Sequence, residues 1–194
     1  MVTRKGDATR TAILDRATAL ARTVGLEGLT IGRLADDLTL SKSGLFAHFG
    51  SKEALQAAVV EHAREQFVAR VLAPALKVAR GEPRLRALLD RWAGWDADEG
   101  GCIFMALAGE LDDRPGPARD ALAAALRDWI DSLATAVRIA IEEGHFRADV
   151  DPAQVAFELY GIMAAAHTTS RLVGDPRVGT RTRRAVDALI ARCR

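Results

Sequence analysis

The sequence predicts an all-α protein, and three observations support this prediction. Alanine, leucine and arginine are abundant, whereas aromatic residues make up only 5% of the 194 residues. Apolar residues recur with helical spacing, and no useful length of chain alternates with the period of two that a half-buried strand requires. Glycine and proline interrupt the chain often enough to divide it into short helices. We therefore expect about nine helices joined by short polar connections.

The first four helices follow from apolar stripes and stop signals. The first is expected at residues 8–24, with Gly25 in the position of a C-terminal cap. Its apolar stripe consists of Ile13, Ala17, Leu20 and Ala21. The second should run from Thr30 to Thr39, and the third from residue 42 to 49. A longer fourth helix should follow Ser51 and end near Gly81, with a kink at Pro74.

Five further helices are expected in the remaining two thirds of the chain, at residues 84–96, 102–112, 118–143, 153–173 and 178–192. The segments EGG, RPGP and GDP separate some of them. The helix at 153–173 is apolar nearly all round, which predicts burial on two sides. One side can pack within the subunit and the other against a partner. Its small residues allow another helix to approach closely: Gly161, Ala164, Ala165 and Ala166.

Composition and charge exclude several classes of protein. Cys102 and Cys193 lie far apart without a Cys/His cluster, so we expect no disulfide framework, no metal site and a reducing cytoplasm. No apolar segment is long enough for a membrane span, and nothing in the sequence predicts a cofactor. The net charge is +1, but residues 1–52 carry 8 basic and 5 acidic side chains and residues 53–170 carry 12 and 19. Because the first part is basic and the body is acidic, the charges favour binding of a polyanion by residues 1–52.

The second and third helices are too short to be stable alone, so they must pack on the first helix and on the start of the fourth. Small Ala35 stands where the two short helices would cross. Leucines at four positions would hold the crossing angle: Leu34, Leu38, Leu40 and Leu45. This spacing predicts a helix-turn-helix, whose second helix can enter the major groove of DNA.

Three successive helix starts combine a hydroxyl cap with a cation in the first turn. The pairs are Thr30 with Arg33, Ser41 with Lys42, and Ser51 with Lys52. A cation there is disfavoured by the helix dipole, at a cost of about 0.3–1 kcal/mol. Unpaired N–H groups together with a mobile cation are typical of a phosphate-binding site. We interpret the three helix starts as phosphate contacts.

From residue 8 to about residue 60 the chain resembles the DNA-binding domain of the TetR family of transcriptional repressors. The family pattern reads roughly Gly-Val-Ser-x-x-Thr-Leu-Tyr-x-His-Phe-x-x-Lys-x-x-Leu, and residues 39–55 here read TLSKSGLFAHFGSKEAL. Chain length and the number of helices also fit that family. The resemblance implies a DNA-binding domain at residues 1–52 and a helical ligand-binding and dimerisation domain at 53–194.

The resemblance also implies roles for single residues. Thr30 would cap its helix against a phosphate, Lys42 and Ser43 would face the groove, and His48 and Lys52 would grip phosphates. The expected contact set is Thr30, Arg33, Ser41, Lys42, Ser43, Gly44, Phe46, Ala47, His48 and Lys52. His48 and Phe49 could instead be core residues, and Lys52 could form a solvated pair with Glu53.

Three positions depart from the family pattern. Phe46 replaces the usual tyrosine, which removes a phosphate hydrogen bond and leaves an apolar contact. Gly44 replaces a common threonine and removes a possible base contact. Thr39 replaces the usual glycine of the turn, and a left-handed conformation there would cost about 1 kcal/mol. The operator sequence therefore cannot be derived from the family.

The body of the chain has a less specific pattern. By resemblance, the helices at 153–173 and 178–192 form a homodimer interface, which implies a near-palindromic DNA site. Bulky and amphipathic groups could converge on a pocket for an unknown small-molecule effector. They are Trp92, Trp95, Cys102, Phe104, Met105, Tyr160, Met163 and His167. Taken singly, each of these residues fits an ordinary core better than a ligand contact.

The leading hypothesis is a dimeric, sequence-specific DNA-binding regulator and no enzyme. It would be a repressor released from a palindromic operator when a ligand shifts the long helix that begins at Ser51. Two alternatives come from other classes. One is a helical small-molecule-binding protein that no longer recognises operator DNA. The other is an enzyme with a Cys102 nucleophile and His145 or His167 as base, although no motif of such chemistry surrounds them.

Overall fold

The computed structural model describes residues 3–194, and the side chains of residues 3–5 are outside that description. The described residues form helices and no strand, which confirms the all-α prediction. The two π-helical stretches η1 and η2 continue neighbouring helices, so the described chain has the nine helical segments that were expected. The chain divides into two compact units, each of which is built from two stretches of sequence.

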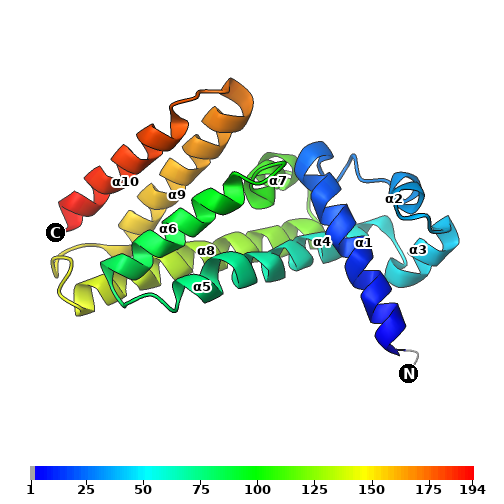
Figure 1. The fold of residues 1–194 in the computed structure, drawn as a ribbon, viewed down its shortest axis with the longest axis horizontal. Helices are drawn as coiled ribbons and strands as arrows, with labels where there is room; N and C mark the ends of the chain where they lie inside the picture. Colours follow the sequence, from blue (N-terminus) through cyan, green and yellow to red (C-terminus); the bar gives the residue numbers. More distant parts are fainter. Residues whose placement is uncertain (1–2) are drawn as a thin grey trace. The chain divides into compact units, whose positions relative to one another are not determined.

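The first unit comprises residues 1–66 and 102–125. Its elements are α1 (Thr3–Val24), α2 (Ile31–Leu38), α3 (Lys42–Phe49), most of α4 (Lys52–Phe67), α7 (Ile103–Leu111) and the start of α8 (Pro117–Glu142). Helices α2 and α3 pack against each other, and α1 packs on both α2 and α7 (Figure 1). The predicted functional boundary at residue 53 is a different division of the chain and stays a prediction.

The core of the first unit contains the apolar positions that the sequence predicts. Ile13 and Ala17 of α1 are fully buried, as are Leu34 of α2 and Leu45 of α3. Ala35 is 1% exposed, as expected for the point where α2 meets its neighbour. Helix α1 begins at Thr3 rather than near residue 8, because Gly6 does not stop it. A glycine inside a helix costs only about 1 kcal/mol, which the packed helix can absorb.

The second unit comprises residues 67–101 and 126–194. Its elements are η1 (Val68–Leu72), α5 (Ala73–Ala75), α6 (Glu82–Asp96), the rest of α8, α9 (Pro152–Thr168), η2 (Thr169–Val173) and α10 (Val178–Cys193). Helices α9 and α10 form an antiparallel pair (Figure 1). Gly174 ends η2 with a φ of 70°, a left-handed conformation that suits glycine.

The segment around Pro74 differs from its prediction in two respects. The helix that begins with α4 ends at Ala75 and does not continue to Gly81. In addition, the π-helical stretch η1 directly precedes the three-residue α5 that contains Pro74. Proline lacks an N–H and its ring meets the carbonyl four residues earlier, so a widened turn before it relieves the conflict. The chain beyond is held by Arg84, whose Nη2 donates to the Val78 carbonyl at 3.0 Å.

Aromatic residues fill the interior of the second unit. Phe67 packs edge-on against Trp95 and Trp129, with ring centroids 5.5 Å and 5.0 Å apart. Leu85, Leu133 and Leu159 of the same unit are fully buried. Among the described helices, none combines the length and hydrophobicity that a membrane span requires.

Candidate nucleic-acid interface

All three predicted helix caps are present in the first unit. The Thr30 hydroxyl accepts from the Arg33 N–H at 3.2 Å, and the Ser41 hydroxyl accepts from the Gly44 N–H at 3.0 Å. The Ser51 hydroxyl accepts from the Ala54 N–H at 3.0 Å. Each side chain satisfies one N–H of its first turn. At the starts of α2 and α3 the other N–H groups remain available to an anion, as a phosphate-binding site requires, whereas at the start of α4 the Glu53 carboxylate accepts from its own N–H.

Helix α3 presents most of its side chains to solvent. Leu45 is its fully buried anchor, whereas Phe46 is 50% exposed. The remaining exposed positions are Lys42, Ser43, Gly44 and Ala47. An eight-residue helix with one fully buried leucine and an exposed face has the form of a recognition helix.

The turn before α3 depends on a strained threonine. Thr39 has a φ of 55° and a ψ of 39°, and it is the one non-glycine residue with positive φ among the described residues. The conformation closes the end of α2, because Leu40 N donates to the Ala35 carbonyl at 2.9 Å. The left-handed turn that the family pattern assigns to glycine is therefore made here by threonine.

Two of the predicted cations are available for contact with a polyanion. Arg33 and Lys42 are exposed, and their side chains have no ion-pair or hydrogen-bond partner among the described residues. The Lys42 ammonium lies close to Gly32, since a Cβ at Gly32 would be 3.6 Å from its Nζ. The head group of Lys42 is thus placed beside the first turn of α2. A cation from α3 and the N-terminus of α2 lie together.

Lys52 has a partner that the sequence did not predict. Its Nζ lies 3.3 Å from Glu27 Oε2 and 3.4 Å from the Glu27 carbonyl oxygen. Glu53, the partner considered from the sequence, instead has its pKa lowered mainly by hydrogen bonds to its own backbone N–H and to Ser51. A phosphate that binds Lys52 must therefore compete with Glu27, which is exposed and screened by solvent.

The loop between α1 and α2, residues 25–30, is clamped from α7. Glu110 accepts from the Leu26 N–H at 3.0 Å and from the Glu27 N–H at 2.6 Å. Gly25 has a φ of 71°, and a side chain there would collide with the Glu110 carboxylate. Gln56 of α4 donates to the Leu26 carbonyl at 2.9 Å. Sequence reasoning missed Glu110, because nothing within α7 marks a contact 84 residues away.

His48 and Phe49, which close α3, are both half-buried. Their ring centroids are 6.3 Å apart, and the Arg10 guanidinium lies 4.9 Å above the Phe49 ring. The cation–π contact links α1 to α3 and orients the end of the helix. Phe49 therefore has a packing role, while the partly exposed His48 remains a candidate phosphate contact.

The predicted ligand residues are distributed over both units. Cys102, Phe104 and Met105 belong to the first unit, where Cys102 and Phe104 are buried. Trp92, Trp95, Tyr160, Met163 and His167 belong to the second unit. Of these five, Trp92 and Met163 line a common cavity of about 530 Å³ between α6, α9 and α10. Trp95 packs in the aromatic cluster instead, and His167 hydrogen-bonds Asp96 through Nδ1 at 2.6 Å.

Family models match both parts of the chain. Residues 13–59 match the model described as bacterial regulatory proteins of the tetR family. Residues 81–186 match the model described as a tetracyclin repressor-like C-terminal domain. Among proteins with curated descriptions, no match was found.

Solved structures share the fold over nearly the whole chain. A TetR transcriptional regulator from Chloroflexus aurantiacus is 27% identical, with a TM-score of 0.85, over 97% of this chain and 95% of that chain. A TetR-family regulator from Cytophaga hutchinsonii is 22% identical, with a TM-score of 0.85, over 97% and 96%. AibR, solved in complex with isovaleryl coenzyme A and operator DNA, is 24% identical, with a TM-score of 0.69, over 93% and 96%.

Proposed function

Since the chain belongs to the TetR family and is a transcriptional regulator with a DNA-binding domain, we propose that it is a repressor whose α3 reads a near-palindromic operator. The observation that carries this proposal is the arrangement at the start of α2. There the capped N-terminus and the unpartnered cation Lys42 lie together beside the exposed face of α3. Phosphate contacts from these groups would position the helix, and its exposed side chains would select the bases.

The expected phosphate contacts involve Arg33, Lys42 and Lys52, with His48 as a further candidate. Lys42 and Arg33 are free to bind, whereas Lys52 exchanges Glu27 for a phosphate. Ser43 and Gly44 would face the groove, and the exposed Phe46 would offer an apolar contact such as a thymine methyl group accepts. Ala47 adds a small apolar surface next to it.

A homodimer through α9 and α10 is part of the proposal. One face of α9 and η2 is exposed and carries apolar or small residues at helical spacing: Phe157, Gly161, Ala165 and Leu172. Phe157 is 68% exposed and Leu172 is 83% exposed, which is unfavourable for surfaces that stay in water. A second copy would cover this stripe and provide a second α3, as a two-fold symmetric operator requires.

Release by a small molecule completes the proposed mechanism. AibR, a protein of the same fold, was solved with an acyl coenzyme A and operator DNA together. In the present chain, the cavity between α6, α9 and α10 offers a place for an effector, with Trp92 and Met163 in its lining. A coupling of about 1–3 kcal/mol between the two sites would suffice to release DNA. A regulator of this kind acts where the DNA is, so we expect a cytoplasmic location.

The direct test is selection of bound duplexes from a random DNA pool. We expect a palindromic consensus, and about tenfold weaker binding of that duplex by Lys42→Ala. Lys77→Ala is the matched control, because Lys77 is an exposed lysine of the second unit. Failure of the folded dimer to enrich any duplex would reject the proposal and favour a helical binding protein without operator reading.

The alternative of a Cys102-dependent enzyme receives no support from the site. Cys102 is 1% exposed, so a substrate could not reach its thiol without a rearrangement. His167 is engaged with Asp96, and His145 Nδ1 accepts from the Glu82 N–H at 3.2 Å. Turnover of any substrate that is abolished by Cys102→Ala would revive this alternative.

A further inference from the structure

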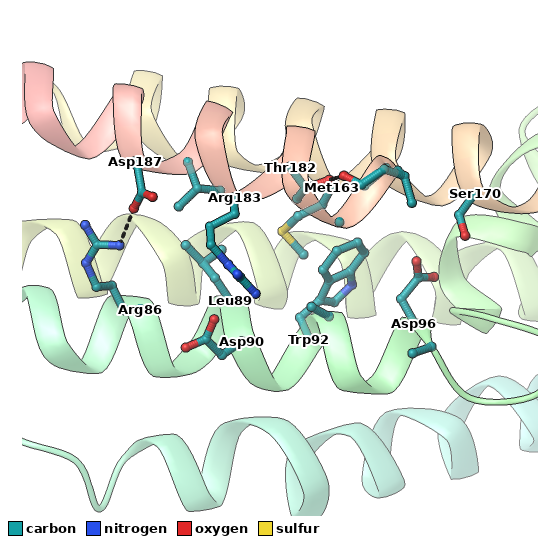
Figure 2. Close-up of a pocket in the computed structure, with 16 residues that line it drawn as sticks. Arg86, Leu89, Asp90, Trp92, Asp96, Met163, Ser170, Thr182, Arg183 and Asp187 are labelled. Carbon is teal, nitrogen blue, oxygen red and sulfur yellow. Dashed lines mark hydrogen bonds and ion pairs between the residues drawn. The ribbon is translucent and has the colours of Figure 1, made fainter. Parts of the chain in front are cut away.

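The cavity between α6, α9 and α10 has an apolar floor made by three buried side chains. Leu89, Trp92 and Met163 are 7%, 3% and 1% exposed, and all three line the cavity (Figure 2). Its volume of about 530 Å³ is within the range of ligand pockets, roughly 300–1,000 Å³. The cavity is defined within the second unit alone. We call it the α6–α10 groove.

Two pairs of side chains engage several of the charged residues that line the groove. Arg86 of α6 binds Asp187 of α10, with 2.7 Å between Nη1 and Oδ1, and this pair spans one end of the groove (Figure 2). At the other end, His167 Nδ1 lies 2.6 Å from Asp96 Oδ1. The Arg86–Asp187 pair is internally compensated, and the Asp96 side chain is engaged by His167.

Two lining residues of opposite charge remain uncompensated. Asp90 on α6 and Arg183 on α10 have no ion-pair or hydrogen-bond partner among the described residues, and they do not pair with each other. Figure 2 shows the Arg183 side chain extending from α10 toward α6, where the Asp90 carboxylate turns upward beside Leu89. The groove therefore has a solvent-exposed carboxylate and a solvent-exposed guanidinium on opposite walls, next to the apolar floor.

We propose that the α6–α10 groove binds a free apolar α-amino acid, and that such a molecule is the effector of the proposed repressor. Its carboxylate would pair with Arg183, its ammonium group with Asp90, and its side chain would lie on Trp92 and Met163. The proposal rests on the function given above and specifies the chemistry of its ligand. An α-amino acid carries an ammonium group and a carboxylate on the same α-carbon. These two groups match Asp90 and Arg183, which face each other across the groove.

Other classes of ligand leave one of the two charges uncompensated. A simple carboxylate would neutralise Arg183 but meet Asp90 with the same sign, and a simple amine would do the reverse. A neutral hydrophobic molecule would cover both charges without pairing either of them. A ligand that covers either exposed charge removes water from it, and only an amino acid replaces that water with an opposite charge at both positions, so the groove favours an amino acid over all three classes. The apolar floor in turn disfavours small polar amino acids.

The first experiment measures binding by isothermal titration calorimetry with the full-length protein and no DNA. L-Phenylalanine and L-leucine are the probes, and 3-phenylpropanoate and 2-phenylethylamine are analogues that each lack one charge. We expect L-phenylalanine or L-leucine to bind, and each single-charge analogue to bind at least about tenfold more weakly than L-phenylalanine. Equal or tighter binding of either analogue would overturn the proposal, as would no binding of any apolar amino acid at millimolar concentration.

Variants assign the two charges to the two groups of the ligand. Asp90→Asn and Arg183→Gln should each weaken amino acid binding about tenfold. Asp90→Asn should leave the weak binding of 3-phenylpropanoate unchanged or improve it, and Arg183→Gln should do the same for 2-phenylethylamine. Arg184→Gln is the control, because Arg184 is the exposed neighbour of Arg183 and does not line the groove. Equal losses in all three variants would contradict a specific role for Arg183.

Operator affinity measured on the same preparations separates this proposal from the function on which it rests. Intact operator binding without amino acid binding rejects the ligand and leaves the repressor proposal standing. Amino acid binding by a protein that selects no duplex supports the groove and rejects the repressor. Binding of L-phenylalanine that weakens operator affinity at least about fivefold supports both.

Discussion

The helix caps of the first unit join residues close in sequence, whereas the polar pairs around the groove of the second unit join distant helices. Each helix cap of the first unit joins residues three positions apart, as Thr30 and Arg33 do. In the second unit, His167 meets Asp96 across 71 residues, and Arg86 meets Asp187 across 101. A DNA-reading face can thus be recognised from a short motif. A ligand groove depends on how helices from different parts of the chain are placed.

The largest difference between the units should follow from breaking the core of the first. Leu45 is fully buried and is the single apolar anchor of α3, so Leu45→Ala should destabilise the first unit by about 2–5 kcal/mol. Hydrogen exchange should show opening of α2 and α3, while the amides of α9 and α10 stay protected. Phe46→Ala, at the exposed neighbouring position, should leave exchange unchanged. Uniform opening of both units would show that they do not differ in this way.

A smaller effect is expected at the long-range contact that Glu110 makes in the first unit. Glu110→Gln replaces a carboxylate that accepts two backbone N–H groups and should cost about 1–3 kcal/mol in unfolding free energy. Chemical denaturation measures this cost, and Glu99→Gln serves as an exposed control. If Glu110→Gln matched that control, the clamp would not hold the loop at residues 25–30.

The second unit should show a pH-dependent stability that originates at Glu82. Hydrogen bonds from Arg194, followed by those from Arg86, hold the pKa of Glu82 below its ordinary value, against the effect of burial. The folded state therefore keeps this charge at lower pH than the unfolded chain does. The resulting stability is complete above the ordinary glutamate pKa of about 4.3 and is lost as the pH falls through the lowered value.

Glu82→Gln should accordingly lower stability by about 1 kcal/mol at neutral pH, because its arginine partners are partly exposed. The difference from the wild type should disappear in acid, below the lowered pKa. Thermal denaturation across this pH range checks the result. A difference that persists at the lowest pH would mean that lost packing, and not the carboxylate charge, causes it.

The smallest expected effect is a gain in stability at the turn of the first unit. Thr39 holds a left-handed conformation that glycine adopts without strain, so Thr39→Gly should stabilise the protein by up to about 1 kcal/mol. Thr23→Gly is a suitable comparison, because Thr23 lies within helix α1, where glycine should destabilise. Destabilisation by Thr39→Gly, measured by the same melting experiment, would show that the side chain has a compensating contact.

The fold could be predicted well because helix periodicity and stop signals are local properties. The buried stripe of α1, the three caps and the left-handed turn at residue 39 all follow from short patterns. Two predicted helix ends were wrong: α1 begins at Thr3 rather than near residue 8, and the helix that begins with α4 ends at Ala75, directly after Pro74, rather than near Gly81. Local patterns therefore predict elements better than they predict their ends.

The candidate sites could be predicted only in part. The cations of the DNA-binding face follow from their positions next to caps, but the pairing of Lys52 with Glu27 does not, since it joins residues 25 apart. Likewise, Trp92 and Met163 were selected for their bulk, whereas Asp90 and Arg183 look like ordinary surface charges in the sequence. Whether such residues face a groove depends on helix packing, which no single segment encodes.

The central claim is that the cations at the helix starts of the first unit bind phosphates. The most direct measurement is the dependence of operator affinity on salt concentration for the wild type, Lys52→Ala and Lys77→Ala. We predict that the slope of log K against log salt falls by about one for Lys52→Ala and stays unchanged for Lys77→Ala. An identical slope in all three proteins would contradict the account, because Lys52 would then remain with Glu27 and take no part in DNA binding.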